Sequence, residues 1–219
     1  SGEVVCASRP YYVPQHFGQF DHLTVAEALR VDGPIKALHA ILAGDASVEN
    51  FTRLNDDWSV EERCLSALAF WDLGHLQLSQ PMHSLSGGEK TKVFLSGISV
   101  HTPEIILMDE PTNHLDISSR DKLYEMVRTG RSTLLIVSHD RTLLNLLPGI
   151  CELERNGVAL YGGNYDFYRE QKELALTALQ NQLDEKEKEL RLARKVARET
   201  LERKNKANAH SDKTSFKKG

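Results

Sequence analysis

The chain has 219 residues, of which 40% are hydrophobic and 26% are charged, a composition typical of a folded protein with one sizeable domain and an appendage. Its apolar runs are far shorter than the roughly 18 residues of a membrane span, and no secretory leader is recognisable, which argues against a membrane or secreted protein. The three cysteines lack CxxC spacing and predict neither a disulfide framework nor a zinc site, so the expected setting is the cytoplasm.

The net charge of −4 is unevenly distributed along the chain. Residues 191–219 carry ten Lys or Arg and three Asp or Glu, a net charge of +7, whereas residues 1–190 carry 17 and 28, a net charge of −11. A basic tail of this kind commonly seeks phosphate or another anion. The alternative is a solvated linker without a partner.

In chain order, residues 2–15 (GEVVCASRPYYVPQ) begin with an apolar run and end at Pro14-Gln15, which predicts a strand that enters a loop. Apolar residues at helical spacing predict helices over 24–42 and 60–73, and a short helix is expected between them in 44–59. The buried faces of the two longer helices are predicted from Val25, Ala28, Leu29, Cys64, Leu65 and Leu68.

Residues 105–110 (IILMDE) and 132–139 (STLLIVSH) are nearly continuous apolar runs, as expected of parallel strands that are covered on both faces. The helical pattern of residues 118–129 lies between them and completes a strand–helix–strand unit. Residues 151–163 (CELERNGVALYGG) then predict a hairpin that turns at Asn156-Gly157.

After Asn164 the pattern changes to steps of three and four residues, which predict a coiled-coil seam on one long helix of about forty residues, roughly 60 Å in length. The segment NAHSDKTSFKKG, residues 208–219, lacks this period, so the helix is expected to stop or turn back there. The seam consists of Leu176, Leu179, Leu183, Lys186, Leu190, Ala193 and Ala197.

Residues 85–89 (LSGGE) are open to two interpretations. Ser86 and Glu89 fit the S-x-x-E capping box that starts a helix. Gly87 and Gly88 would also expose the first amides of that helix, which together with the Ser86 hydroxyl are suited to holding a phosphate. The two interpretations are compatible.

Polar residues also follow the two buried strands. Asp109 and Glu110 end the first strand and His139 follows the second, so all three are expected at the edge of the sheet where ligands bind in α/β proteins. Asp109 could hold Mg²⁺, usually through a water molecule, and Glu110 could orient and deprotonate an attacking water. His139 would then be placed to hold a γ-phosphate. Each residue alone would more often be structural.

The order of these motifs resembles the nucleotide-binding domains of the ABC ATPase superfamily. The motifs are Gln15 in YVPQ, LSGGE at 85–89, LMDEPTNHLD at 107–116 and SHD at 138–140. The resemblance implies an α/β fold of the P-loop NTPase type, with a helical subdomain at about 16–103, that binds ATP and Mg²⁺.

The resemblance also implies a role for each matching residue. Gln15 would sense Mg²⁺ and the γ-phosphate, and Asp109 would be the Walker B carboxylate that holds the metal. Glu110 would be the catalytic glutamate and His139 the switch histidine. The signature motif would cap ATP that is bound by the partner domain of a dimer, and it consists of Ser86, Gly87, Gly88 and Glu89. Asp116 would contact that partner domain.

The motif DEPTNHLD, followed by YGGNYDFYREQKE and a long charged helix, resembles the ABC-F family within this superfamily. This implies a partial first nucleotide-binding domain over 1–163 and a helical interdomain linker over 164–219. The expected partners are a second nucleotide-binding domain, in the same chain or a dimer partner, and the ribosome, through rRNA or tRNA at the basic linker. No membrane partner is expected, and the family includes translation factors and antibiotic-resistance proteins.

One expected motif is missing, because no GxxxxGK[ST] phosphate loop occurs in the sequence. The simplest expectation is a truncated domain that is inactive alone, although the intact parent would hydrolyse ATP. The alternatives are the ATPase subunit of an ABC transporter, an ATPase head of the SMC type, and a non-catalytic fragment that supplies only the signature motif to a partner's ATP. In an ATPase head of the SMC type the coiled coil enters before the signature motif, whereas in this chain it follows the His139 strand. The long basic helix argues against a transporter subunit.

Overall fold

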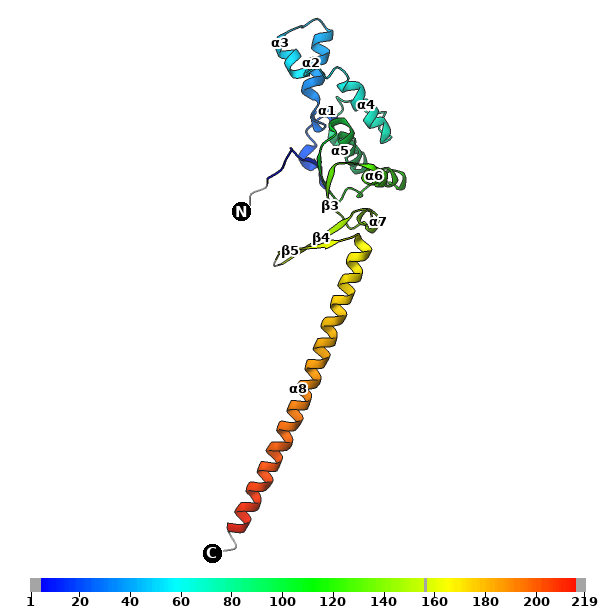
Figure 1. The fold of residues 1–219 in the computed structure, drawn as a ribbon. Helices are drawn as coiled ribbons and strands as arrows, with labels where there is room; N and C mark the ends of the chain where they lie inside the picture. Colours follow the sequence, from blue (N-terminus) through cyan, green and yellow to red (C-terminus); the bar gives the residue numbers. More distant parts are fainter. Residues whose placement is uncertain (1–4, 156, 216–219) are drawn as a thin grey trace. The chain divides into compact units, whose positions relative to one another are not determined.

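The computed structural model describes residues 5–155 and 157–215 (Figure 1). The polypeptide divides into two compact units, Ser1–Leu147 and Pro148–Gly219. The first contains a parallel sheet and a group of helices. The second contains a hairpin and the long helix.

The sheet of the first unit has three parallel strands in the order β1-β2-β3. These are β1 (Tyr11–Val13), β2 (Ile105–Asp109) and β3 (Thr133–Val137). Tyr12 pairs with Leu107, which pairs with Leu135. The strands predicted at 105–110 and 132–139 are therefore confirmed. The predicted N-terminal strand is much shorter than expected, since Val5 and Cys6 are not in a strand and Val4 lies outside the described residues.

Only one face of this sheet is covered by the described residues. Val13, Ile106 and Met108 point into the core, together with apolar residues of two helices. On the other face Leu135 and Val137 are each 58% exposed. The expectation that both faces are covered is therefore wrong for β3 in the part of the chain that the structure describes.

The helices on the buried face are α5 (Gly87–His101) and α6 (Ile117–Thr129). The predicted helix at 118–129 is confirmed, and its Leu123 and Val127 are buried. Helix α5 approaches β1 so closely that the Tyr11 hydroxyl donates to the Phe94 carbonyl at 2.9 Å. A Cβ atom on Gly97 would lie 1.8 Å from the same hydroxyl oxygen, so this position requires glycine.

A helical subdomain extends away from the sheet (Figure 1). Its helices are η1 (Gly18–Phe20), α1 (Val25–Ala28), α2 (Asp32–Leu42), α3 (Val48–Leu54) and α4 (Val60–Phe70). The single helix predicted over 24–42 is wrong, because the chain breaks at Arg30, which adopts a left-handed φ of 59°. The short helix predicted in 44–59 is confirmed as α3.

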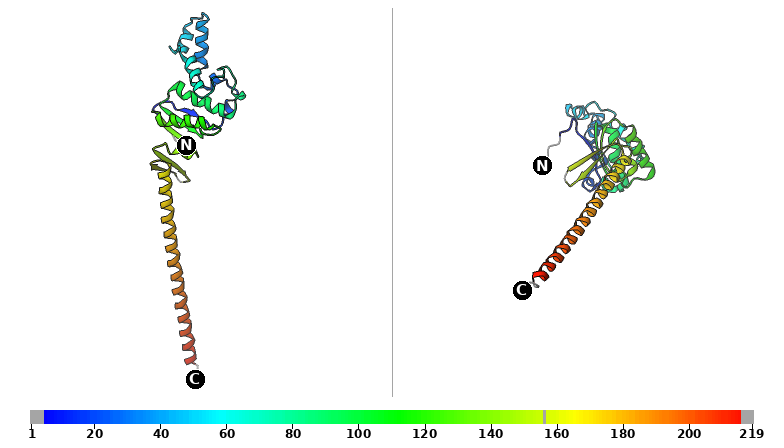
Figure 2. Two further views of the ribbon diagram at one scale, coloured as in Figure 1. Left: turned by 90° about the vertical axis from the view of Figure 1, so that its right-hand side faces the viewer. Right: turned by 60° about the horizontal axis from the view of Figure 1, so that its bottom comes forward.

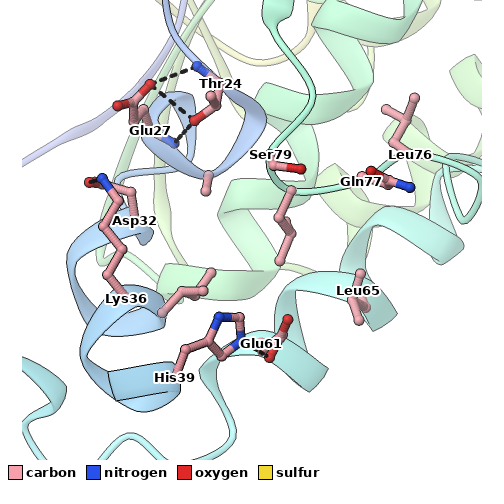
Figure 3. A pocket seen from close by; sticks show the side chains of 13 residues that line it. Thr24, Glu27, Asp32, Lys36, His39, Glu61, Leu65, Leu76, Gln77 and Ser79 are labelled. Carbon is pink, nitrogen blue, oxygen red and sulfur yellow. Dashed lines mark hydrogen bonds and ion pairs between the residues drawn. The ribbon is translucent and has the colours of Figure 1, made fainter. Parts of the chain in front are cut away.

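The helical subdomain encloses a hollow of about 480 Å³ between α1, α2, α4 and residues 76–79 (Figure 3). A hydrogen bond at its wall joins His39 Nε2 and Glu61 Oε2 at 2.8 Å. Leu65 lines the hollow and is 43% exposed, so its predicted burial is wrong, whereas Cys64 and Leu68 are buried as expected. The first unit is completed by η2 (Met82–Ser84) and α7 (Arg141–Leu144).

The second unit begins with an antiparallel hairpin of β4 (Gly149–Glu154) and β5 (Gly157–Gly162). Glu154 pairs with Gly157, so Gly157 belongs to the strand and the turn lies before it. The predicted turn at Asn156-Gly157 is therefore displaced, and Asn156 itself lies outside the described residues. Lys172 of the following helix contacts Glu152 of β4 at 2.7 Å.

The following helix, α8 (Tyr165–Ser215), has 51 residues, which corresponds to about 75 Å. Figures 1 and 2 show it uninterrupted from three directions. The expectation that it stops at Asn208 is wrong, because no proline or glycine occurs between 165 and 215 to end it. No helix among the described residues is both long and apolar enough to span a membrane.

Candidate functional site

Three predicted site residues follow the carboxyl ends of the three parallel strands. Gln15 lies two residues beyond β1, Glu110 directly follows β2, and His139 lies two residues beyond β3. Because the strands are parallel, these ends lie along one edge of the sheet. The structure therefore places Glu110 and His139 at the edge where the sequence predicted them, and Gln15 at the same edge.

Glu110 and His139 are in direct contact at this edge. Oε1 of Glu110 lies 3.6 Å from Nε2 of His139, and the backbone N–H of His139 donates to Oε2 of Glu110 at 3.3 Å. Glu110 is only 8% exposed, whereas the His139 side chain is fully exposed. The pair thus presents a sheltered carboxylate beside an accessible imidazole, which suits a base and a hydrogen-bond donor that act on one ligand.

Glu110 is also held by its backbone. Its N–H donates to the carbonyl of Val137 at 2.8 Å, which extends the β2–β3 pairing by one residue. Its φ of 47° is left-handed, a conformation that non-glycine residues seldom adopt. The chain therefore turns sharply at Glu110 while its side chain stays beside β3.

Asp109 and Gln15 line a second hollow, of about 380 Å³, together with Tyr12 and His16. The Tyr12 hydroxyl donates to Oδ2 of Asp109 at 3.5 Å. Partial burial raises the pKa of Tyr12, and the negative charge of Asp109 raises it further. Tyr12 was not predicted as a site residue, although its place one residue before the end of β1 puts it beside Asp109.

The oxygen atoms of Asp109 and Gln15 suit a hard cation such as Mg²⁺. Among the described residues, no group of three or more His, Cys, Asp or Glu side chains is arranged to hold a metal ion. An ion bound here would therefore take most of its ligands from water and phosphate oxygens, as Mg²⁺ commonly does.

The capping-box interpretation of Ser86 and Glu89 is confirmed. The Glu89 N–H donates to the Ser86 hydroxyl oxygen at 3.3 Å, and the Ser86 N–H donates to the Glu89 carboxylate at 2.8 Å. The Ser86 hydroxyl donates to the same carboxylate at 2.7 Å, and these hydrogen bonds lower the pKa of Glu89. To donate to a phosphate, the Ser86 hydroxyl would have to leave Glu89.

Asp116 caps the start of α6 and also pairs with α5. Its carboxylate accepts from the Ser119 N–H at 2.8 Å and lies 3.0 Å from Nζ of Lys92. These contacts, the hydrogen bond from Ser119 above all, lower the pKa of Asp116. Lys92 was not predicted as part of the site, since nothing in the sequence relates it to a residue 24 positions away.

The predicted residues form two separate groups. Gln15, Asp109, Glu110 and His139 lie at the sheet edge, whereas Ser86 to Glu89 form the first turn of α5. Within the described part of the chain, no hydrogen bond or ion pair joins Ser86 or Glu89 to the sheet-edge residues. The arrangement fits two half-sites that serve different ligands.

Comparisons with known proteins agree with this geometry. The family described as ABC transporter matches residues 7–113. The chain is 41% identical to the ATP-binding protein Uup of Escherichia coli K12 over 120 residues, which cover 54% of this chain and 18% of Uup. It is 34% identical to the erythromycin resistance ATP-binding protein MsrA of Staphylococcus epidermidis over 149 residues, which cover 66% of this chain and 28% of MsrA.

A further relative is the uncharacterised ABC transporter ATP-binding protein YkpA of Bacillus subtilis 168, which is 35% identical over 142 residues. These residues cover 64% of this chain and 26% of YkpA, so the chain spans about a quarter of the length of this relative. Among solved structures, an ATP-binding subunit of an ABC transporter superposes with a TM-score of 0.52 at 23% identity, covering 75% of this chain and 62% of that subunit.

The solved structure supports the fold, and the family match covers Gln15, Ser86 to Glu89, Asp109 and Glu110. The chain contains part of an ABC nucleotide-binding domain followed by a long helix. Over these residues the chain therefore resembles the ATP-binding domains of the ABC family.

Proposed function

We propose that this chain is part of the first nucleotide-binding domain, with the start of the interdomain linker, of an ABC-F protein that hydrolyses ATP and acts on the ribosome in the cytoplasm. The observation that carries the proposal is the contact between the sheltered Glu110 carboxylate and the exposed His139 imidazole at the ligand-binding edge of the sheet. The domain limits of 1–163 and 164–219, with a helical subdomain at about 16–103, are part of the proposal.

At the sheet edge, Glu110 accepts a proton from the attacking water and His139 donates a hydrogen bond to the terminal phosphate. The burial of Glu110 and its two contacts with His139 support these roles, because they hold the carboxylate in one place. Asp109 and Gln15 would hold Mg²⁺, which when bound would supply positive charge to neutralise the phosphates during transfer.

The first turn of α5 serves a different ATP molecule, bound by a partner domain. Ser86, Gly87, Gly88 and Glu89 cap that nucleotide, and Asp116 contacts the partner. The separation of this turn from the sheet-edge residues supports a role across a dimer interface. The partner is the second nucleotide-binding domain of the same protein or a second copy.

The basic part of α8 binds ribosomal RNA or tRNA through its phosphates. Its excess of positive charge and the resemblance to MsrA, whose name refers to erythromycin resistance, support this role. The protein then acts as a translation factor or protects the ribosome from an antibiotic.

A second candidate applies to the 219-residue chain by itself. Because its sequence contains no GxxxxGK[ST] motif, the chain alone offers Ser86 to Glu89 to a partner's nucleotide and catalyses no hydrolysis. The missing GxxxxGK[ST] motif favours this non-catalytic role. A form of the protein that contains the motif therefore distinguishes the two candidate functions.

The test compares the 219-residue chain with a longer form that extends upstream through a phosphate loop and downstream through a second domain. We expect ATP binding and hydrolysis, and ATP-dependent cosedimentation with ribosomes, only in the longer form. Hydrolysis by the longer form that is unaffected by Glu110→Gln would refute the assigned role of Glu110. Equal cosedimentation with and without ATP would refute ATP-controlled action on the ribosome.

A further inference from the structure

The hollow in the helical subdomain is walled mainly by one face of each of two helices (Figure 3). On α4, Glu61 and Leu65 are four residues apart and therefore lie on the same side of the helix. Residues 76–79 and part of α1 complete the wall. The lining residues of α2 have the spacing i, i+3, i+4 and i+7, and they are Asp32, Ile35, Lys36 and His39. The hollow is therefore shaped by the packing of regular elements.

Much of this wall is apolar, and part of its apolar surface is exposed. Leu65 lines the hollow and is 43% exposed, although Cys64 and Leu68 of the same helix are buried. Ile35 and Leu76 add apolar surface from α2 and from the loop at 76–79. A volume of about 480 Å³ falls in the range of roughly 300–1,000 Å³ that is usual for pockets that bind small molecules. The hollow is thus suited to the apolar body of such a ligand.

The charged residues that line the hollow are mostly acidic. Glu27, Asp32 and Glu61 carry carboxylates, whereas Lys36 is a cation. The Lys36 side chain is 72% exposed, and its Nζ lies 3.2 Å from Oδ2 of Asp32. Even with a protonated His39, the carboxylates outnumber the cations among these lining residues. The wall therefore favours a cation and disfavours an anion.

Glu61 is the carboxylate best placed to meet a ligand. Its Oε2 lies 2.8 Å from Nε2 of His39, which holds the side chain at the wall. In the part of the chain that the structure describes, no hydrogen bond or ion pair engages its Oε1. The Glu61 side chain is 37% exposed, and Leu65 follows it by one turn on the same face of α4. A carboxylate oxygen that can accept a hydrogen bond thus lies beside exposed apolar surface.

We propose that this hollow binds a small organic cation, an amine whose apolar body packs against Leu65 and Leu76 and whose ammonium group donates to Glu61. This inference goes beyond the proposed function and does not rest on it. An anion of the same shape would be repelled by the excess of carboxylates. A neutral molecule would fill the apolar part and gain no charge-assisted hydrogen bond at Glu61.

The first test titrates the 219-residue chain with phenylpropylamine, which is protonated at neutral pH, and follows backbone amides by nitrogen-15 NMR. We expect the amides of Leu65 and Leu78 to shift along one saturable curve. Phenylpropanol has the same apolar body without the charge and should bind about tenfold more weakly, and phenylpropanoate should not bind. Equal affinity for the amine and the alcohol would overturn the proposal, as would shifts confined to residues outside the hollow.

The second test removes the charge of Glu61. Glu61→Gln keeps the shape of the wall, so it should lower the affinity for phenylpropylamine about tenfold and leave the affinity for phenylpropanol unchanged. The matched control is Glu62→Gln, which removes the same charge from the next residue of α4, where the side chain is exposed and does not line the hollow. If the two variants weaken amine binding equally, the attraction comes from general surface charge and the proposal is overturned.

The third test fills the hollow. Leu65→Trp adds volume at a position that is already partly exposed, and it should abolish binding of both the amine and the alcohol. If this variant does not fold, as judged by circular dichroism, Leu65→Asn removes the apolar contact instead and should weaken both ligands. Unchanged affinities in the folded variant would overturn the assigned site. None of these measurements depends on ATP hydrolysis, so their failure is distinct from a failure of the proposed function.

Discussion

The Oε1 atom of Glu110 lies 3.6 Å from Nε2 of His139, although 28 residues separate the two in the sequence. The contact follows from the parallel pairing of β2 and β3, in which Asp109 lies opposite Val137. The residues that follow these partners therefore leave the sheet side by side. The contact between Glu110 and His139 thus depends on the register of β2 and β3.

The first prediction concerns the imidazole. In the longer form that carries a phosphate loop, His139→Ala should lower kcat on the order of 10²-fold, because a hydrogen-bond donor to the transferred phosphate is removed. Steady-state phosphate release measures the effect. The control is His39→Ala, which breaks the similar His39–Glu61 pair in the helical subdomain and should change kcat by less than twofold. Similar decreases in both variants would indicate damage to the fold.

The second prediction concerns the general base. Glu110→Gln in the longer form should slow hydrolysis by about 10²–10⁴-fold, as expected when a general base is removed, and should leave ATP affinity unchanged. The variant should stay closed around ATP and cosediment with ribosomes more than the wild type does. Equal cosedimentation in the presence of ATP would contradict this. The 219-residue chain should release phosphate no faster than buffer, with or without the substitution.

Much of this sheet edge could be predicted from the sequence, because continuous apolar runs end in Asp109-Glu110 and in Ser138-His139. The bare face of β3 could not, since Leu135 and Val137 look like any other buried strand residues. A Cβ atom on Gly88 would lie 2.6 Å from the carbonyl oxygen of His114. This contact was also hidden, because a glycine restricted by a distant neighbour has no local signature.

The same reasoning explains the errors in the helices. The periodic pattern of residues 24–42 continues through the break at Arg30, because the left-handed residue is not a glycine and leaves the spacing of apolar residues intact. At the other end of the chain, residues 208–215 remain helical without an apolar face. The spacing of apolar residues indicates which face of a helix is buried. It does not indicate where a helix ends when the segment contains no proline or glycine.

The third prediction tests the two faces of the sheet. Met108→Ala should lower the free energy of unfolding of the 219-residue chain by about 2–5 kcal/mol, because it opens a cavity in the core. Leu135→Ala should lower it by less than about 0.5 kcal/mol, since this side chain is 58% exposed. Urea unfolding followed by circular dichroism measures both. A large cost at Leu135 in this chain would show that its face is covered.

The fourth prediction concerns acid and Asp116, whose pKa is lowered chiefly by the hydrogen bond from Ser119 and further by Lys92. A lowered pKa in the folded state stabilises the protein above the unfolded value of about 3.9, and this contribution is lost as the pH falls towards the folded value. Asp116→Asn keeps a helix cap but cannot titrate. The stability advantage of wild type over this variant should therefore be constant above about pH 5 and shrink below pH 4.

The check is urea unfolding of both proteins from pH 7 down to pH 3. Other carboxylates titrate in this range, so only the difference between the two proteins is informative. A control is Asp116→Asn in the Lys92→Met background, where the part of the pH dependence due to the ion pair should be absent. An advantage that grows as the pH falls would contradict the sign of the shift.

The last prediction concerns the basic part of α8. Arg191, Arg194, Lys195 and Arg198 occupy helix positions i, i+3, i+4 and i+7, so their side chains emerge on one face. Arg191 and Arg198 pair with Glu187 and Glu202 on the same helix. Within the described part of the chain, no ion pair engages Arg194 or Lys195, which makes these two the most available to phosphates.

Replacing Arg194 and Lys195 by Gln in the longer form should weaken ribosome binding, and more so at low salt, because each cation that binds a phosphate releases counterions. The slope of log affinity against log salt should become shallower by about two, roughly one for each phosphate-binding cation that is replaced. Lys186→Gln with Lys188→Gln removes the same charge from the same helix outside the basic segment and should leave the slope unchanged. If the two pairs behave alike, α8 acts through its general charge as a solvated linker helix and not through an RNA-binding face.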